Sequence, residues 1–182
     1  MQNHYSFIGG KLGSWRVSSI TSIQGESLPS VTHLHIVNAP AHTLQLPGVW
    51  VLQGFTSNVR YAERHEITQL RSKQEGLNRH QATCAALIPI RKNAQWWALS
   101  QDERRAIFEE QSHHTAIGLE YLPHIARQLH HSRDLGEPFD FLTWFEFAPE
   151  HTEAFEQLLT RLRASKEWCY VEREVDIRLV RG

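Results

Sequence analysis

Short apolar runs separated by turn-forming residues dominate the first half of the chain. Three of these runs are rich in β-branched and aromatic residues and are bounded by glycine, proline or asparagine, a pattern typical of β-strands. The expected strands span residues 15–23, 33–37 and 49–55. The polar stretch 59–70 could form a strand or a short helix, and residues 72–82 have the composition of a loop.

The second half has clearer boundaries between strands and helices. Residues 85–90 form an apolar run that is expected to be a buried strand. Ser100 followed by Glu103 matches a capping box, which predicts the start of a helix that continues towards Pro123. Proline at that point should break or kink the helix, and a further helical stretch is expected at about residues 124–131.

Three further elements follow, each with its own spacing of apolar positions. Residues 139–147 alternate as a strand with bulky groups on both faces, so this strand should be central or covered on both sides. One face carries Phe139, Phe141, Phe145 and Phe147, and the other carries Leu142 and Trp144. Residues 150–165 have the spacing of an amphipathic helix. Residues 168–180 alternate apolar with charged side chains, which predicts a half-buried strand with one solvent-facing side.

The order of these elements predicts the fold class. Strands and helices alternate as β-α-β-α-β after a strand-rich first half, which indicates an α+β protein with helices packed on an antiparallel sheet. A boundary near residue 80 separates a strand-rich half, residues 1–80, from residues 81–182. The two halves are expected to share one continuous sheet.

Composition excludes several classes of protein. The formal net charge of -1 and the isoelectric point near 6.9 give no reason to expect nucleic acid as a partner. The two cysteines, Cys84 and Cys169, form no zinc-binding pattern and no Cys-x-x-Cys-His attachment motif. No signal peptide is visible, and no apolar run reaches the roughly 18–20 residues that span a bilayer. A soluble cytoplasmic protein is therefore expected.

The densest group of chemically active side chains lies in residues 111–127. His113 and His114 are adjacent, so on a helix they point about 100° apart and only one can face the interior. His114 shares its face with Ile117 and Gly118, and glycine one turn later leaves room for a flat ligand. A hydrogen-bonded core histidine is the alternative, and the residues alone favour it.

Arg127 lies in an otherwise apolar patch after Pro123. An arginine there must pair or face a cavity, because burying an isolated charge is costly. A surface arginine with a packed stem is the alternative, and spacing alone favours it. An uninterrupted helix would place Arg127 about 220° round from His114, but Pro123 leaves their relative positions open.

Lys92, Glu167 and two adjacent tryptophans are the other candidates. A carboxylate such as Glu167 can accept the second N–H of a metal-bound imidazole, and a neighbouring lysine would keep that carboxylate ionised. A salt bridge at the ends of two strands is the alternative. Trp96 and Trp97 could belong to the core or form one wall of a cofactor slot.

Taken together, these segments resemble the chlorite dismutase family. The resemblance rests on Lys92, on Trp96 and Trp97, on His-His-Thr-Ala-Ile-Gly and Arg127, and on two later runs. These runs are Phe-Asp-Phe-Leu-Thr-Trp-Phe-Glu-Phe and Leu-Arg-Ala-Ser-Lys-Glu-Trp-Cys-Tyr-Val. The match is close over residues 85–175 and loose in the first half. Its specificity comes from the combination of spaced motifs.

The resemblance implies a ferredoxin-like, dimeric α+β barrel with non-covalent haem b in the C-terminal half. The short length and abbreviated first half resemble the small, homodimeric branch of the family. At matching positions, His114 is implied to be the proximal iron ligand and Glu167 its hydrogen-bond acceptor. Lys92 is implied to be the lysine beside that pair, and Arg127 the arginine on the distal side of the haem.

Further positions match the aromatic and polar lining of the family's haem pocket. Trp96, Trp97 and Trp144 are implied to line the haem. The segment Thr-Ser-Asn-Val-Arg-Tyr resembles the stretch that contacts the haem propionates, with Asn58 and Tyr61 as the candidates.

The activity implied by the resemblance is conversion of chlorite to chloride and dioxygen. Chlorite would transfer one oxygen to ferric iron, leaving a ferryl species and a hypochlorite fragment that the guanidinium of Arg127 holds in place. Three alternatives stay open: a peroxidase or coprohaem decarboxylase on the same scaffold, a non-enzymatic haem-binding protein, and a dimeric scaffold without cofactor.

Overall fold

The computed structural model describes residues 3–56, 64–65, 68 and 76–182. In these residues, eight antiparallel strands close into a barrel in the order β1-β3-β2-β8-β5-β7-β6-β4. The first half supplies β1 (Asn3–Gly10), β2 (Trp15–Gln24), β3 (His33–Val37) and β4 (Trp50–Thr56). The second half supplies β5 (Cys84–Lys92), β6 (Ala126–His131), β7 (Phe141–Phe147) and β8 (Val171–Arg181). The expected α+β class, with an antiparallel sheet, is confirmed.

The strands of each half are neighbours in the barrel, and the two halves join at two seams. At one seam β2 pairs with β8 from Trp15 opposite Arg181 to Gln24 opposite Glu174. At the other seam β4 and β6 share a much shorter pairing. The two halves of the chain, which meet near residue 80, therefore share one continuous sheet.

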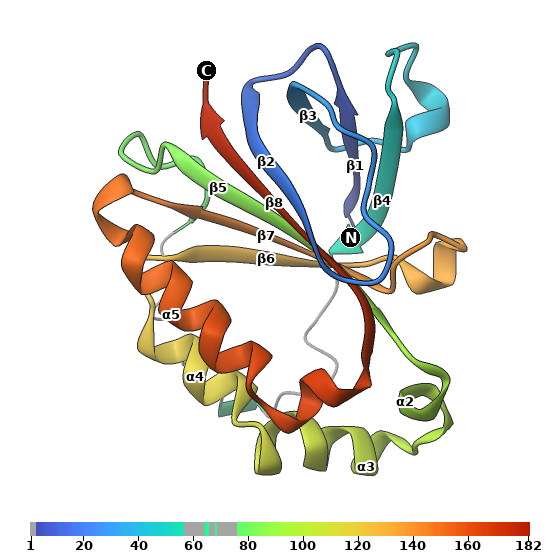
Figure 1. Cartoon of the computed structure of the whole chain (residues 1–182), viewed down its shortest axis with the longest axis vertical. Helices are drawn as coiled ribbons and strands as arrows, with labels where there is room; N and C mark the ends of the chain where they lie inside the picture. The colour runs from blue at the N-terminus through green and yellow to red at the C-terminus, as the bar shows by residue number, and fades with distance from the viewer. Residues whose placement is uncertain (1–2, 57–63, 66–67, 69–75) are drawn as a thin grey trace.

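Helices cover one outer face of the half of the barrel formed by β5 to β8. In Figure 1, α4 (His114–Glu120) and α5 (Thr152–Arg163) lie across these strands, while α2 (Ala94–Ala98) and α3 (Gln101–Arg105) lie at one end. Shorter turns are η1 (Ala41–Thr43), η3 (Arg133–Leu135), η4 (Pro149–His151) and η5 (Lys166–Tyr170), and a π-helical segment is η2 (Ala106–Gln111). Among the described helices, none is long and apolar enough to cross a membrane.

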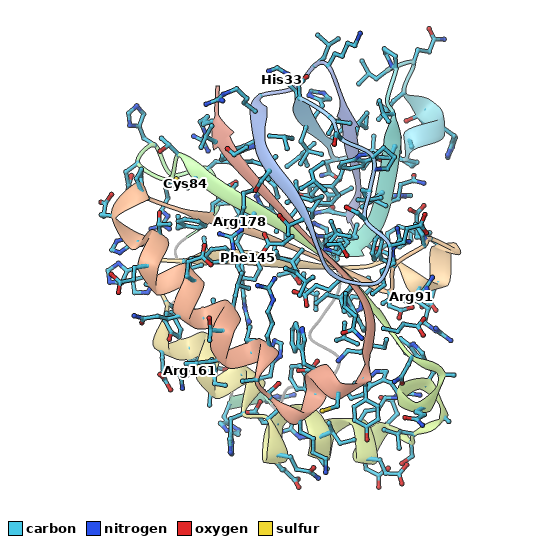
Figure 2. The ribbon with its side chains drawn as sticks, in the orientation of Figure 1. His33, Cys84, Arg91, Phe145, Arg161 and Arg178 are labelled. Atoms are coloured by element: carbon cyan, nitrogen blue, oxygen red, sulfur yellow. The ribbon has the colours of Figure 1, made fainter. Side chains whose placement is uncertain are left out.

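Alternation along the strands divides the core into two apolar layers. Side chains such as Phe7, Leu52 and Trp144 fill the inside of the barrel. Phe145 and its neighbours on the outer face pack against α5 through Phe155, and Ile117 of α4 joins the same layer. Figure 2 labels Phe145 on this sheet, with Cys84 and Arg91 near the two ends of β5. The expectation that β7 is covered on both sides is confirmed.

The polar side of β8 is buried, so the expectation of a solvent-facing side was wrong. Glu174 and Asp176 are 1% and 5% exposed, and both pair with Arg163 of α5. Arg178 joins them by pairing with Asp176 and with Glu156. Because α5 packs across this face, its arginine compensates charges that would otherwise be too costly to bury.

Residues 126–131 form strand β6, so the helix expected at residues 124–131 was wrong. This segment pairs along its whole length with β7. Strand pairing and burial between neighbouring strands outweigh the weak local preference of this segment for a helix. The segment after Ser100 also differs: the capping box is present, but α3 gives way to η2 and then to a separate α4.

Two smaller differences concern strand boundaries. Strand β1 was not expected from the sequence; it lies between β3 and β4 in the barrel. Strand β7 begins at Phe141, and Phe139 precedes it and packs inside the barrel rather than on the face of Phe145. Phe139 lies before the strand, and the alternation of side chains between the two faces of a sheet applies only within a strand.

A buried histidine makes the stability of the barrel depend on pH. His130 is 1% exposed, and burial lowers its pKa from 6.5 to about 4. The folded protein therefore keeps this imidazole neutral, whereas the unfolded chain binds a proton below about pH 6.5. We expect the free energy of unfolding to be highest above that pH and to fall by up to about 3 kcal/mol as the pH drops towards 4.

Denaturant unfolding at a series of pH values measures this dependence. Nδ1 of His130 lies 3.1 Å from the carbonyl oxygen of Leu142, and the amide of His130→Asn can make a similar hydrogen bond. This variant should lose much of the pH dependence, whereas His42→Asn, at an exposed position, should keep it. An unchanged slope in His130→Asn would contradict the assignment.

Candidate functional site

Three polar side chains, from β5, η5 and the start of α4, are joined in a row by hydrogen bonds. Nδ1 of His114 lies 2.8 Å from Oε2 of Glu167, and Nζ of Lys92 lies 2.7 Å from the other carboxylate oxygen, Oε1. The side chains of Lys92 and Glu167 are 3% and 6% exposed, and that of His114 is 19% exposed. The carboxylate therefore bridges a buried ammonium and a more accessible imidazole.

Glu167 stays ionised in spite of its burial. Burial alone would raise the pKa of Glu167, but the positive charge of Lys92 and the hydrogen bonds from His114 and Lys92 lower it to about 2. An ionised carboxylate accepts the Nδ1–H of His114 and so directs the other ring nitrogen, Nε2, away from Glu167. This arrangement suits an imidazole that binds a metal through Nε2.

Three local structures position Lys92 and Glu167. Lys92 closes β5 at a register shift, and Asn93 caps α2 by accepting a hydrogen bond from the backbone N–H of Trp96. The backbone N–H of Asn93 donates to the carbonyl of Tyr170, which ties the start of α2 to η5. The N–H of Glu167, within η5, donates to Oγ of Ser112. These bonds fix both ends of the ion pair.

An abrupt change of backbone direction places His114 at the start of α4. The π-helical segment η2 ends before His113, which has φ of 52°, a left-handed conformation that is uncommon for a residue with a side chain. The ring of His114 then stacks on Phe108 with centroids 4.3 Å apart and lies nearly parallel to Trp168 at 6.4 Å. The imidazole is therefore held by ring contacts as well as by Glu167.

Arg127 reaches the same helix from the sheet. It lies in β6 opposite Phe145, so its side chain points to the outer face that the helices cover. A Cβ atom built on Gly118 would lie 2.9 Å from Nη1 of Arg127. Gly118 follows His114 by four residues, so the two share one side of α4. The guanidinium therefore lies against the helix face that carries His114, and the absence of a side chain at Gly118 makes room for it.

The three tryptophans occupy different places. Trp96 is buried, with Nζ of Lys92 4.2 Å from its ring centroid, so it belongs to the surroundings of the ion pair. Trp97 donates a hydrogen bond to Asp140, which also accepts one from the backbone of Lys92. Trp144 lies inside the barrel, on the opposite side of the sheet from Arg127. The structure brings Trp96 and Trp97 near Lys92 and leaves Trp144 apart.

Asn58 and Tyr61, the candidates for contacting propionates, lie outside the described residues. The structure also places four residues against the site that sequence reasoning missed: Phe108, Glu109, Ser112 and Trp168. Each contacts His114, Glu167 or the start of α4 through a long-range or helix-to-helix contact. Only the closeness of Ser112 and Trp168 in sequence to His114 and Glu167 could have pointed to them.

The donor set suits a prosthetic group held by one imidazole. In the part of the chain that the structure describes, no three His, Cys, Asp or Glu residues come together as a metal-binding cluster. The described part of the site offers one partly exposed imidazole, whose Nδ1 is bound to a carboxylate, and a guanidinium beside a glycine. A metal carried in a prosthetic group that supplies its other ligands would fit this set.

Comparisons with known proteins agree on the family. A family model described as chlorite dismutase matches residues 39–181. The dimeric chlorite dismutase from Nitrobacter winogradskyi is 56% identical, with a TM-score of 0.91 over 97% of this chain and 99% of that one. The chlorite dismutase from Candidatus Nitrospira defluvii in complex with imidazole shares the fold, with 22% identity and a TM-score of 0.71 over 98% and 91% of the two chains.

A curated relative matches over a shorter segment. The chlorite dismutase from Ideonella dechloratans is 40% identical over 62 residues, which make up 34% of this chain and 20% of that protein. The aligned segment is thus a small part of that longer relative. The family model covers most of the chain, however, and the similarity to the Nitrobacter protein extends along nearly all of it. The chain belongs to the chlorite dismutase family.

Proposed function

We propose that this protein is a haem b-dependent chlorite dismutase, which converts chlorite to chloride and dioxygen without an external reductant. The observation that carries the proposal is the chain from Lys92 through Glu167 to His114, with the guanidinium of Arg127 on the same face of α4. The similarity to chlorite dismutases over nearly the whole chain supports the choice of substrate.

His114 is the residue that would hold the haem iron, through Nε2. Its Nδ1–H donates to Glu167, which makes the imidazole a stronger electron donor and fixes the orientation of its ring. Lys92 keeps Glu167 ionised, so the carboxylate accepts the hydrogen bond from the Nδ1–H of His114 throughout the working pH range. Bound haem would supply the redox chemistry of iron. The protein supplies the ligand, its basicity and its orientation.

Arg127 is the residue that would bind the substrate anion. Burial lowers the pKa of Arg127, and the charge of Glu109 opposes this change; an arginine side chain nevertheless stays protonated at any working pH. A permanent positive charge in a half-buried site attracts chlorite and retains anionic fragments that would otherwise diffuse away and oxidise the protein. Its five N–H donors suit an oxyanion.

One pair of measurements tests the proposed function. The purified protein, reconstituted with haemin, should show a Soret band, and addition of chlorite should release one dioxygen per chlorite at an oxygen electrode. A Soret band without oxygen release would reject the proposal in favour of a haem-binding protein or, if coprohaem and peroxide react, of a decarboxylase. Absence of a Soret band would reject haem dependence itself.

We further propose that the protein is a homodimer. The support is its similarity over 97% of its length to the dimeric enzyme from Nitrobacter winogradskyi. The mass in solution, measured by light scattering against the 21.1 kDa of one chain, tests this proposal.

A further inference from the structure

Asp140, which precedes β7, is a buried acidic residue with three donors around its side chain. Its Oδ2 atom accepts hydrogen bonds from the backbone N–H of Lys92, at 2.7 Å, and from Nε1 of Trp97, at 3.2 Å. The other oxygen, Oδ1, lies 3.3 Å from Nη1 of Arg133. Only 4% of Asp140 is exposed, so it needs such donors. Two of the three come from residues that the sequence had assigned to the site.

The bond from Lys92 completes the end of a strand. The ladder between β5 and β7 ends where Ile90 lies opposite Phe141, two residues before Lys92. Alternate residues of a strand direct their backbone groups to the same neighbour, so the N–H of Lys92 faces β7 as the carbonyl of Ile90 does. That carbonyl accepts the backbone N–H of Asp140, at 2.9 Å. The side chain of Asp140 therefore takes the place of a strand partner for Lys92, beside the register shift between β5 and β8.

The path of this backbone determines where the ammonium of Lys92 lies. Nζ of Lys92 is buried between Oε1 of Glu167, at 2.7 Å, and the ring of Trp96, with 4.2 Å to the centroid. Displacement of one partner of a buried ion pair leaves the other without compensation, so the pair depends on exact placement. Iron bound at Nε2 of His114 would lie on the far side of the imidazole from Glu167. A bound haem would therefore not come between these residues.

We propose that Asp140 is a positioning residue: by binding the backbone N–H of Lys92, it holds the ammonium of that residue on Glu167. Its bond from the indole N–H fixes the orientation of Trp97 as well. If Lys92 is displaced, the charge of Glu167 is less compensated, and the carboxylate pulls more strongly on the Nδ1–H of His114. The effect on bound haem rests on the proposed function, whereas the placement of Lys92 does not.

Labelling of the haem-free protein tests the placement of Lys92. Asp140→Asn keeps an oxygen that can accept from both Lys92 and Trp97, whereas Asp140→Ala removes every acceptor of this side chain. Acetylation of Lys92 by acetic anhydride is measured by mass spectrometry against the exposed Lys166 of the same molecule. We expect it to be about tenfold faster in Asp140→Ala than in the unmodified protein. In Asp140→Asn it should stay within about twofold.

Two controls separate placement from a general loss of stability. Arg133→Ala removes the third partner of Asp140 and should leave the labelling of Lys92 within about twofold of the unmodified protein. Hydrogen exchange at the backbone N–H of Leu87, within β5, measures how often the whole barrel opens, and labelling in Asp140→Ala should exceed what that opening allows. If Asp140→Ala does not fold, Asp140→Glu replaces it, because the longer side chain displaces the carboxylate and should also speed labelling.

The iron–histidine stretching band of the haem-loaded, ferrous protein tests whether Asp140 acts through Lys92. This band, recorded by resonance Raman spectroscopy, moves to higher frequency as Glu167 pulls more strongly on the Nδ1–H of His114. Lys92→Met and Asp140→Ala should both shift it in that direction, and Asp140→Asn should leave it in place. The double variant should shift no further than Lys92→Met alone, because two substitutions that act through one group are not additive.

The possible results are distinct. Equal labelling of Lys92 in Asp140→Ala and the unmodified protein, or equal acceleration in Asp140→Ala and Asp140→Asn, overturns the proposed placement. An additive shift in the double variant overturns the action through Lys92. If the unmodified protein shows no Soret band, the proposed function fails, and labelling still tests the placement. If it releases oxygen from chlorite while labelling is unchanged, the inference fails and the proposed function stands.

Discussion

Replacing His114 with alanine is expected to abolish the Soret band of the haemin-reconstituted protein and to reduce oxygen release from chlorite to background. His114 is partly exposed and keeps Nε2 for a metal, since its Nδ1 is bound to Glu167. Without this nitrogen, the iron loses the protein ligand that the proposed function requires. Absorption spectra after removal of excess haemin, followed by the oxygen electrode, measure both effects.

The neighbouring histidine provides the control for this experiment. His113 is exposed and has a positive φ, which asparagine tolerates, so His113→Asn should bind haem and release oxygen as the unmodified protein does. If His114→Ala kept an unchanged Soret band and unchanged oxygen release, the iron would be held elsewhere. The roles given to Glu167 and Lys92 would then lose their basis.

Arg127→Ala is expected to keep the Soret band but to lower the rate of oxygen release by on the order of 10²-fold, with faster inactivation during turnover. Arg127 lies on β6 and does not contribute to the chain from His114 to Lys92, so haem binding should survive. The loss of its charge removes the group that attracts chlorite and retains anionic fragments. Initial rates and the total oxygen released per protein separate slow turnover from early inactivation.

Two further variants show whether the charge or the shape of Arg127 matters. Arg127→Lys keeps the charge but not the planar set of donors, and its rate should lie between those of the unmodified protein and Arg127→Ala. Arg91→Ala removes an exposed arginine at the end of β5 that pairs with Glu172, and it should leave oxygen release unchanged. Full and lasting oxygen release by Arg127→Ala would show that the anion needs no cation at this position.

The sequence identified the chemical groups of the site better than their surroundings. His114, Glu167, Lys92 and Arg127 were all singled out, and the structure brings them to one region. Spacing alone left each of them with an ordinary structural interpretation, and the family resemblance was needed to choose. Glu109 was missed because a carboxylate that caps a helix after a backbone reversal has no spacing rule to reveal it.

Local physics determined part of this protein from the sequence by itself. The capping box at Ser100, the apolar spacing of α5 and the turn-bounded runs of β2, β3 and β4 depend on contacts within a few residues, so the sequence predicts them directly.

Tertiary structure decided the rest. Residues 126–131 became a strand because β7 offered a complete set of pairing partners, and this strand turns Arg127 towards α4. The charged side of β8 became an interior surface because α5 lies on it and Arg163 pairs with its carboxylates. In both places, burial and pairing between residues far apart in the chain outweigh the local structural preference of the segment. A local sequence pattern does not show which distant residues will become its partners.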